Sequence, residues 1–587
     1  MSKTIDFKAD VVHNNNRYRI ILGIVLFMYA TYCSRRGVDV SDTTYALGNY
    51  QYMDQLDSMW MIATFLSNMF GRLILSLPGA GTLYGVTVYA TCLFAIFIEI
   101  MYLALSKYIT YWMVFIAEVL AVSLCWAPKV IFYNYITYGM MAFAILIIVY
   151  SLMNSKPKYL LLAGMILGIN VFVRFSNAVE CLLIIGLWLY EVLEHHKPSE
   201  LIKKTVLCIA GYIIGFTIPF ISVIIKYDLN TYFNMIDSLF AMTETASDYS
   251  GAGVFRTMRY MIQDTFNDMK YLVCLTILFV ACAFIMYLVT EKIDKDGRVA
   301  KILNFLLRFT NILALLCICI YFFKKGVYTT NYYEYSSIFK CANMFIVLAF
   351  MLNVLNVFGI FKCSSILRAM SLMCIVQMVI APMGTNNHMY AIMNNMFITA
   401  PVTFAIIYRV YELMKEKKYG FYIYSFCIYI VAVVLFQSVI FHMNFSYVDG
   451  TDGSSLDTVI SSVGRLRGSK TTPEKADNLE SLYEYIQTND MLGQKVLLFG
   501  QESVGLAYIM DLEPAIDTLW PDLDSYTVGK FENAISDIED GAMIIMSEKL
   551  TTGANVDTKK QMLIDYIEEN GYVKVFENSM YTLYDVK

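Results

Sequence analysis

Four carboxylates crowd a short polar segment that directly follows the first apolar stretch of the chain. They are Asp39, Asp42, Asp54 and Asp57, within RRGVDVSDTTYALGNYQYMDQLDSMW. A carboxylate held at the mouth of a membrane cavity can act as a general base that accepts a proton from an attacking hydroxyl. The alternative is a solvated loop. A divalent cation could also bind such a cluster, although nothing in the spacing fixes a coordination geometry and no cofactor is predicted.

Arginines close to apolar segments are the candidate ligands for an anion. The planar guanidinium can bind two phosphate oxygens at once, and the candidates are Arg72, Arg174, Arg256 and Arg259. Arg174 is the most informative, because a charge near a membrane span is costly unless it snorkels or serves a polar cavity. Snorkelling to lipid headgroups is the alternative for this residue.

A polar segment, PMGTNNHMYAIMNN, separates two apolar stretches at residues 382–395. Asn386, Asn387 and His388 could bond sugar hydroxyls or phosphate, but Asn-Asn after Gly-Thr is also ordinary turn chemistry. The five His residues of the chain show no metal-ligand spacing, so we predict no metal site.

The elements that must position these residues are membrane helices. Of the residues, 58% are hydrophobic and only 16% are charged, which is too apolar for a water-soluble surface. A span needs about twenty mostly apolar residues, and the sequence predicts about 13 transmembrane helices. Their approximate cores are 20–34, 83–105, 110–127, 136–153, 159–173, 177–193, 205–225, 271–290, 305–323, 338–358, 367–383, 396–412 and 421–442.

Orientation follows from the Lys and Arg residues, which collect in cytoplasmic loops. Their distribution predicts a cytoplasmic N-terminus, a multi-pass protein of the cell membrane, and exterior loops at 35–82, 226–270 and 382–395. Within the first loop, the apolar stretch 59–77 is interrupted by Asn68 and Arg72, so we expect a helix that lies at the interface. The alternative is an additional span.

A soluble domain follows the membrane part. We predict a transmembrane domain over 1–445, a linker over 446–472 and an extracytoplasmic α/β domain over 473–587. The last is predicted because helices alternate there with short apolar strands such as KVLLFG and AMIIMS. From residue 470 onward the chain has nine Lys and no Arg against 22 Asp and Glu. This acidity argues against a nucleic-acid partner, because phosphate binding depends on Lys and Arg.

Gly164 and Gly168 form a small-xxx-small pair in GMILG. Such pairs let two helix backbones approach closely in a membrane. We therefore interpret them as packing residues and not as a binding motif.

The order of these features resembles the GT-C class of membrane glycosyltransferases, which includes protein O-mannosyltransferases and aminoarabinose transferases. The similar segments run in order through most of residues 20–442. They are Asp42 with SDTTYALGNYQY, then YNYITYGMMAFAILIIVYSL, then AGMILGINVFVRFSN, and finally GTNNHMYAIMNN. The resemblance implies a polytopic helical GT-C-like fold and transfer of a sugar on the exterior face from a polyprenyl phosphate donor.

The resemblance also implies roles for individual residues. Asp42 occupies the position of the catalytic base, and the acceptor would be a glycan, a lipid or a protein. The family often has an acidic pair at this position, whereas Thr43 follows Asp42 here, which leaves open whether Asp39 supplies the second carboxylate. The expected substrate-binding residues are Asp39, Tyr45, Arg72, Arg174, Asn386, Asn387 and His388.

Two further functions fit the same sequence. One is a transporter or flippase for a lipid-linked saccharide, in which the loops bind substrate without cleaving it. Transporters commonly contain internal repeats, and none is visible in this sequence. The other is a polysaccharide polymerase or ligase that uses a different donor.

Overall fold

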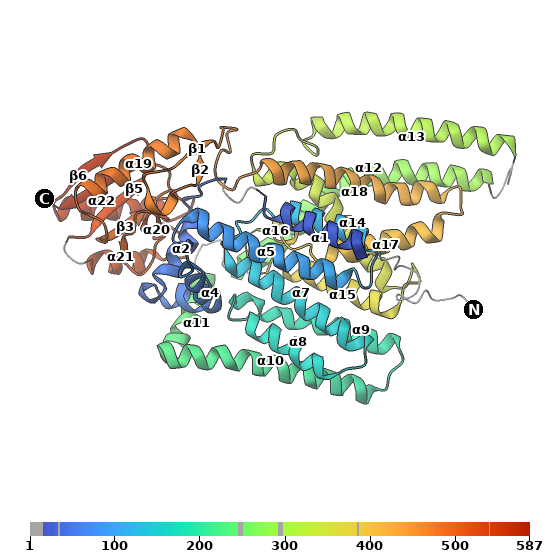
Figure 1. The fold of residues 1–587 in the computed structure, drawn as a ribbon, viewed down its shortest axis with the longest axis horizontal. Coiled ribbons are helices and arrows are strands. Elements are labelled where there is room, and N and C mark those ends of the chain that lie inside the picture. The colour runs from blue at the N-terminus through green and yellow to red at the C-terminus, as the bar shows by residue number, and fades with distance from the viewer. Residues whose placement is uncertain are drawn as a thin grey trace.

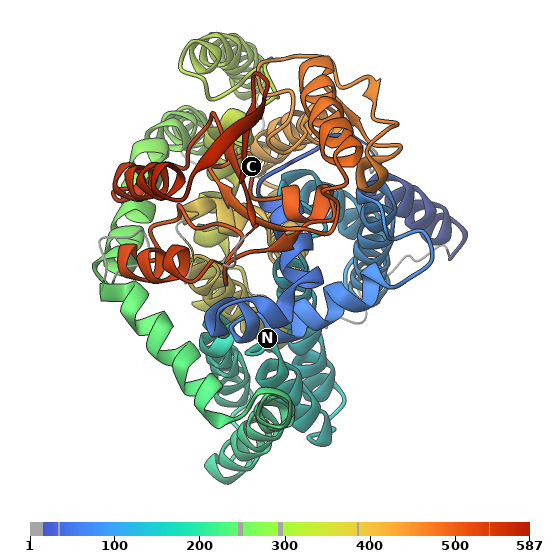
Figure 2. The same cartoon turned by 90° about the vertical axis from the view of Figure 1, so that its left-hand side faces the viewer.

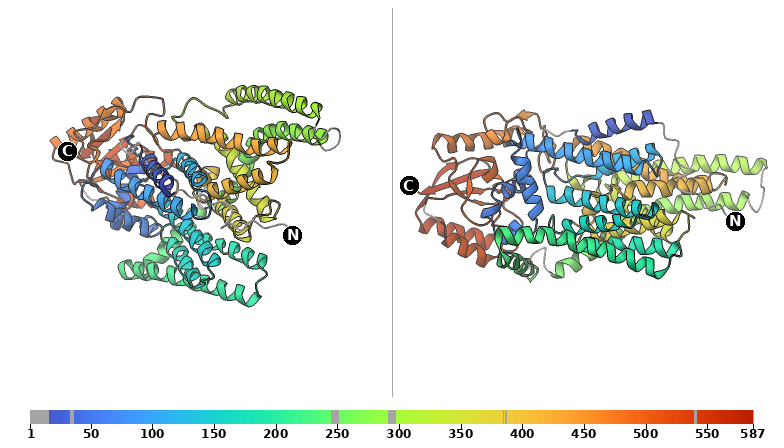
Figure 3. Two further views of the ribbon diagram at one scale, coloured as in Figure 1. Left: turned by 45° about the vertical axis from the view of Figure 1, so that its right-hand side comes forward. Right: turned by 60° about the horizontal axis from the view of Figure 1, so that its bottom comes forward.

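A helical body carries a small α/β domain at one end (Figure 1). The structure is a computed structural model that describes residues 16–32, 36–244, 251–290, 297–383, 385, 387–538 and 541–586. The helices of the body run side by side along the long axis of the molecule, and the C-terminal domain covers one end of them (Figure 3, right). Viewed from that end, the sheet lies over the helix termini (Figure 2).

Eight helices among the described residues are long and apolar enough to cross a membrane. The chain is therefore a multi-pass membrane protein. The eight are α5 (Leu83–Leu105), α7 (Phe132–Met153), η2 with α9 (Phe175–Leu183 and Ile184–Leu193), α10 (Pro198–Tyr227), α12 (Gly251–Leu288), α13 (Arg298–Lys324), η4 with α14 (Tyr335–Ile338 and Phe339–Val357) and α18 (Gly420–Asn444).

The other predicted spans correspond to shorter helices. These are α1 (Asn16–Ala30), α6 (Tyr111–Leu124), α8 (Lys158–Asn170), α15 (Ser365–Ile380) and α17 (Thr399–Met414). Each of the thirteen predicted cores thus overlaps a helix. The number of helices that cross the bilayer, and the orientation of the termini, stay predictions.

The first predicted exterior loop contains several short helices. After α2 (Asp42–Gln51) and η1 (Met53–Gln55), the apolar stretch 59–77 forms α3 (Ser58–Ile62) and α4 (Phe65–Leu75). At 1.5 Å per residue, α4 is about 16 Å long, which is about half of a bilayer's hydrocarbon core. Its length favours the predicted interface helix over an additional span.

The second predicted exterior loop, 226–270, is also helical. It contains α11 (Leu229–Glu244) and the first turns of α12, while residues 245–250 lie outside the described part. The third, 382–395, contains the short helix α16 (His388–Met393). The segments predicted to lie outside the bilayer therefore contain helices.

Glycines bring α8 and α10 into backbone contact. A Cβ added at Gly164 would lie 2.0 Å from the carbonyl oxygen of Cys208, and one at Gly168 would lie 2.1 Å from that of Tyr212. Gly211 and Gly215 of α10 contact α8 equally closely in return. The interpretation of GMILG as a packing motif is therefore confirmed.

We expect the Gly168→Ala substitution to destabilise the protein by about 3 kcal/mol, because the new methyl group would force two backbones apart. Thermal unfolding in detergent measures the effect. The matched control is Gly139→Ala in α7, where the added Cβ meets only the side chain of Phe97, at 3.7 Å. That substitution should leave stability unchanged or raise it slightly, because Ala favours helix. Equal melting temperatures for the two variants would contradict the packing role.

The C-terminal domain contains a five-stranded sheet in the order β4-β3-β5-β7-β6. Strands β3 and β4 and strands β3 and β5 are parallel, whereas β7 is antiparallel to both β5 and β6. The strands are β3 (Lys495–Phe499), β4 (Glu513–Pro514), β5 (Met543–Ser547), β6 (Tyr572–Glu577) and β7 (Tyr581–Val586), and the helices are α19 (Pro473–Thr488), α20 (Leu506–Ile509), α21 (Val528–Ser536) and α22 (Val556–Glu569). The predicted α/β character is confirmed.

The predicted linker, 446–472, is folded. It forms β1 (Thr458–Val459) and β2 (Lys470–Thr471), which pair with each other, and a turn of 3-10 helix, η5 (Gly464–Leu466). Arg465 donates to the carbonyl of Gly81 at 3.2 Å and pairs with Asp511 at 2.7 Å. This segment therefore joins the two parts of the molecule through specific contacts.

One hydrophobic core spans the junction between the two parts. Val38, Leu47 and Tyr50 from the first predicted exterior loop are buried in the same cluster as Leu479 and Tyr508 of the C-terminal domain. Close backbone contact adds to this packing, because a Cβ on Gly505 would overlap the side chain of Thr44. The first loop thus packs against both the helical body and the C-terminal domain. This packing holds the carboxylates of the loop in place.

Candidate functional site

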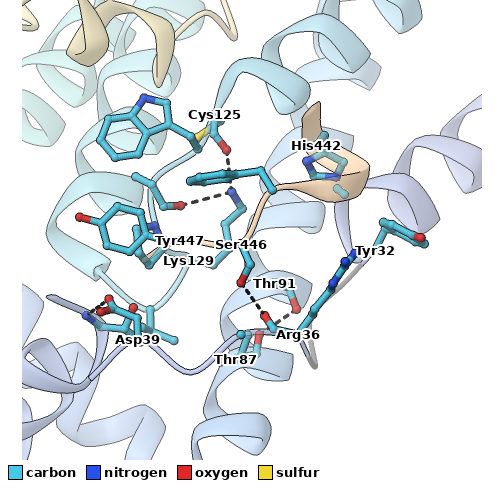
Figure 4. Close-up of a pocket in the computed structure, with 18 of the residues that line it drawn as sticks. Tyr32, Arg36, Asp39, Thr87, Thr91, Cys125, Lys129, His442, Ser446 and Tyr447 are labelled. Carbon is cyan, nitrogen blue, oxygen red and sulfur yellow. Dashed lines mark hydrogen bonds between the residues drawn. The ribbon is translucent and has the colours of Figure 1, made fainter. Parts of the chain in front are cut away.

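A cavity of about 160 Å³ lies at the junction between the helical body and the C-terminal domain. Its walls come from the end of α1, the chain at 36–43, the start of α5, the loop between α6 and α7, and the end of α18 (Figure 4). Two cationic side chains line it, Arg36 and Lys129, together with hydroxyl groups and aromatic rings. The cationic side chains can bind an anion, and the hydroxyl groups can bond to its polar substituents.

Lys129 lies in the loop between α6 and α7. Its ammonium donates to the carbonyls of Cys125 at 3.1 Å and Ala127 at 3.5 Å and to the hydroxyl of Tyr135 at 3.0 Å, and it lies 4.7 Å from the centroid of the Phe94 ring. Burial lowers the pKa of Lys129 below its ordinary value. An anion in the cavity would favour the charged form, and it would bind an N–H of Lys129 by replacing one of these three bonds.

Arg36 is held by segments that are distant in the sequence. Its side chain donates to the carbonyl of Met443 at 3.1 Å, and its backbone forms an isolated parallel bridge with Lys470. The next residue, Gly37, has φ of 93° and donates its N–H to the carbonyl of Lys470 at 2.8 Å. Glycine adopts this left-handed conformation without strain, which allows the chain to turn at the cavity wall.

Asp449 fixes the segment that follows Arg36. Its carboxylate accepts from the N–H of Val38 at 2.8 Å and from the hydroxyl of Thr471 at 2.7 Å, and it pairs with Lys475 at 2.9 Å. Asp449 is buried, so removing Lys475 would leave an uncompensated charge in the protein interior. This buried group joins the cavity wall to the C-terminal domain.

Asp39 uses its carboxylate to shape the loop. It accepts from the N–H of Ser41 at 2.9 Å, from the hydroxyl of the same residue at 2.6 Å, and from the N–H of Thr43 at 2.7 Å. These bonds satisfy donors at the start of α2, in the manner of a helix cap. Both oxygens of Asp39 are therefore engaged by the protein.

Asp42 is the first residue of α2 and has a different environment. One of its oxygens accepts a short hydrogen bond from the hydroxyl of Tyr447. Burial, and then repulsion by Asp39, raise the pKa of Asp42 to about 6, while the hydrogen bond from Tyr447 opposes the rise. Such a carboxylate is ionised at neutral pH yet more basic than an ordinary aspartate, as a general base requires.

Stacked aromatic rings hold Tyr447 in place. Its ring is nearly parallel to that of Trp126, with 5.8 Å between centroids, and Trp126 also stacks on Tyr335 with 5.1 Å between centroids. Tyr390 of α16 packs edge-on against Trp126. The side-chain oxygen of Asn394 accepts from the N–H of Trp126 at 2.9 Å. The 382–395 segment thus shapes the cavity through its second half.

Three predicted substrate-binding residues lie away from the cavity walls. Tyr45 packs edge-on against Trp520 of the C-terminal domain, with ring centroids 5.2 Å apart. Arg72 pairs with Asp54 at 2.7 Å, and Asp54 also pairs with Lys226 at 2.9 Å. The guanidinium of Arg174 lies 5.6 Å from the ring centroid of Tyr133. Each of these contacts is one that supports the fold.

The remaining predicted residues lie in the 382–395 segment. Asn386 lies outside the described residues. The backbone N–H of Asn387 donates to the hydroxyl of Thr385 at 2.9 Å, which is turn chemistry. His388 stacks on Tyr260 with ring centroids 5.1 Å apart, and its Nδ1 lies 3.7 Å from a carboxylate oxygen of Asp264. His388 thus anchors α16 against α12.

Sequence reasoning missed Arg36, Lys129 and Tyr447. A usable signal existed for the first two, because each is a cation placed where an apolar helix ends. Tyr447 had no such signal, since it is one of 45 tyrosines and its partner Asp42 is about 400 residues earlier. No protein-family model matches the chain, and no curated protein matches it either.

Proposed function

We propose that this protein is an inverting glycosyltransferase of GT-C type that moves a sugar from a polyprenyl phosphate donor to an acceptor. One observation carries the proposal. Arg36 and Lys129 line the same cavity as Asp39 and Tyr447, and Tyr447 is bonded to the basic carboxylate of Asp42. Cations for a leaving phosphate and a base for an acceptor hydroxyl are the two groups that this reaction needs.

The location of the cavity suits a lipid-linked donor. It lies at the ends of apolar helices, where α5 and α18 reach the C-terminal domain. A polyprenyl chain is soluble in the bilayer while its phosphate stays near water, so a headgroup site belongs at such a boundary. Lys129 and Arg36 would bind the phosphate and stabilise the negative charge that develops on it as the sugar leaves.

The acceptor would react from the side of Asp42. Its hydroxyl oxygen attacks C1 of the sugar, the bond between C1 and the phosphate oxygen breaks, and the electron pair leaves with the lipid phosphate. The hydroxyl proton passes to the carboxylate of Asp42. A single displacement of this kind inverts the configuration at C1. The acceptor is a glycan, a lipid or a protein, and the reaction takes place on the exterior face in this proposal.

Release of lipid phosphate tests the proposal directly. Purified protein in lipid nanodiscs is incubated separately with polyprenyl phosphate mannose, glucose and N-acetylglucosamine, and free polyprenyl phosphate is measured by mass spectrometry. We expect release from one donor, which would also identify the sugar. No release from any donor, with the sugar-bearing lipids recovered intact, would argue against transfer from this donor class.

Transfer should fall in acid. Because Asp42 must be ionised to accept a proton, we expect the rate to fall about tenfold per pH unit below pH 6, following the raised pKa of about 6. The rate falls in acid because protonated Asp42, which predominates below this pKa, cannot accept a proton. The measurement is lipid phosphate release between pH 4.5 and 8. A rate independent of pH over this range would show that no carboxylate with this pKa acts as the base.

A buried polar pair between two helices favours the second candidate function, a flippase for a lipid-linked saccharide. Helix α8 ends at Asn170, and the next span begins with the 3-10 helix η2. The side chain of Asn170 donates to Glu180 at 2.7 Å, and both side chains are buried among membrane helices. Buried polar and ionisable groups inside membrane spans often mark a substrate pathway. Movement of a fluorescent donor across a vesicle membrane with its phosphate–sugar bond intact would support this function.

A further inference from the structure

Tyr447 stands between the cavity and Asp42. The Tyr447 side chain lines the cavity, whereas Asp42 is not among the residues that line it. The hydroxyl of Tyr447 donates to the carboxylate of Asp42, so the two groups are already in proton-transfer contact. A hydroxyl bound in the cavity would therefore meet Tyr447 before it could meet Asp42.

Asp39 does not offer a second route for the proton. It also lines the cavity, but its two oxygens already accept three hydrogen bonds from Ser41 and Thr43. Taking up a proton would break part of the cap at the start of α2. The Tyr447 hydroxyl is thus the group through which the cavity communicates with a basic carboxylate.

The ring of Tyr447 is held in one orientation. Trp126 stacks on Tyr447 with an angle of 17° between the rings, and Tyr335 stacks on Trp126 with an angle of 23°. The side-chain oxygen of Asn394 accepts from the backbone N–H of Trp126 at 2.9 Å and from that of Ala127 at 3.1 Å. A hydroxyl that must pass protons in a fixed direction needs such support.

We propose that Tyr447 is a catalytic proton relay between the acceptor and Asp42, an inference that rests on the proposed glycosyl transfer. The acceptor oxygen forms a bond to C1 of the sugar as the bond from C1 to the phosphate oxygen breaks. The acceptor proton moves to the Tyr447 oxygen, and the original Tyr447 proton moves to Asp42. The lipid phosphate leaves with the electron pair, so atoms and charge balance.

The surroundings of Tyr447 require the two proton transfers to be concerted. Burial, and then the charge of Asp42, raise the pKa of Tyr447 above its ordinary value, and Asp39 and Tyr133 act in the same direction. The charges that would oppose this rise in the pKa of Tyr447 are those of Lys129 and Arg36, which also line the cavity. A free phenolate is therefore unfavourable, so Tyr447 gives up its proton only as it receives another.

The Tyr447→Phe variant tests the relay by lipid phosphate release from the donor that wild-type protein accepts. We expect the rate to fall about a hundredfold or more, which is the usual contribution of a positioned acid–base group. The matched control is Tyr526→Phe in the C-terminal domain, which removes a tyrosine hydroxyl bonded to Asp517 at 2.6 Å. The control should keep the wild-type rate, because neither residue of its Tyr–Asp pair lines the cavity.

Two other results would contradict the relay but would be consistent with the proposed function. If Asp42 takes the proton directly, Tyr447→Phe keeps its rate at high pH, and its acid limb moves to higher pH because a bond that lowers the pKa of Asp42 is lost. If Tyr447 only blocks the acceptor, the variant is faster than wild type. Failure of the proposed function is distinct, because wild-type protein itself would then release no lipid phosphate.

A second substitution covers the case in which Tyr447→Phe does not fold. Incorporating 3,5-difluorotyrosine at position 447 keeps the ring and the hydroxyl but makes the phenol more acidic. A relay predicts a rate that changes at least severalfold and a changed solvent isotope effect. An unchanged rate and isotope effect would overturn the proposal.

Discussion

We expect the Asp42→Asn variant to transfer sugar at least about a hundredfold more slowly than wild type, because a general base contributes a factor of about 10² to 10⁴. Asn has nearly the same shape as Asp and can still accept the hydrogen bond from Tyr447, so the loss reports chemistry and not packing. Initial rates of lipid phosphate release at pH 7.5 measure the effect. Full activity in this variant would show that another group is the base.

The same variant should fold at least as well as wild type. The pKa of Asp42 is about 6 in the folded protein against an ordinary value of 3.8, so folding favours the neutral carboxyl. That contribution is fully present below pH 3.8, is lost as the pH rises through 6, and is absent at neutral pH. A neutral Asn avoids the burial of charge, so its melting temperature at pH 7.5 should equal or exceed that of wild type.

Asp54→Asn is the matched control for Asp42→Asn. Asp54 belongs to the same segment between α1 and α5, but it pairs with Arg72 and Lys226 and is partly exposed. Burial alone would raise the pKa of Asp54, yet bonds from Tyr227, Lys226 and Arg72 hold the pKa well below its usual value. Asn at this position should lower the melting temperature slightly and leave transfer close to wild type. A similar loss of transfer in both variants would argue for a structural effect.

The second large effect is expected at the cations. Replacing Lys129 with Met should lower the rate of transfer about a hundredfold to a thousandfold, because a fixed donor to a developing oxyanion contributes about that much. Arg36→Gln should act in the same direction, and the two losses should not add fully, since both groups would contact one phosphate. Rates at saturating donor separate this loss from weaker binding of the donor.

Two controls separate charge from structure at Lys129. Lys129→Arg keeps the positive charge and should recover part of the activity, although the guanidinium has a different geometry. Lys574→Met removes a lysine from an exposed pair with Glu577 on β6 and should leave the rate unchanged. If Lys129→Met transferred sugar at the wild-type rate, the cavity would not be the phosphate site.

Much of the architecture could be predicted because it follows from local patterns. Apolar runs of about twenty residues mark the membrane helices, and short runs such as KVLLF and MIIMS became the adjacent parallel strands β3 and β5. Such patterns depend on neighbouring residues, so a single sequence contains them. The glycines of GMILG belong to the same category, because close helix packing needs small residues at that spacing.

The candidate site was predicted only in part because its contacts are non-local. Asp42 was found from its place after the first helix, but Tyr447, which bonds to it, follows the last helix of the body. Arg72 was predicted as an anion ligand, yet Asp54 and two carbonyls at the end of α2 already accept hydrogen bonds from it. Whether a cation is available to a ligand depends on partners that sequence spacing does not identify.

The shared core at Val38, Leu47 and Tyr50 has a consequence for biosynthesis. Ribosomes complete this early segment long before they reach Leu479 and Tyr508, which complete its packing. During that interval its apolar side chains lack their native neighbours, so chaperones or the membrane surface must shield them. The site therefore matures only after the last part of the chain has been translated, and nascent chains that terminate early would retain an incomplete pocket.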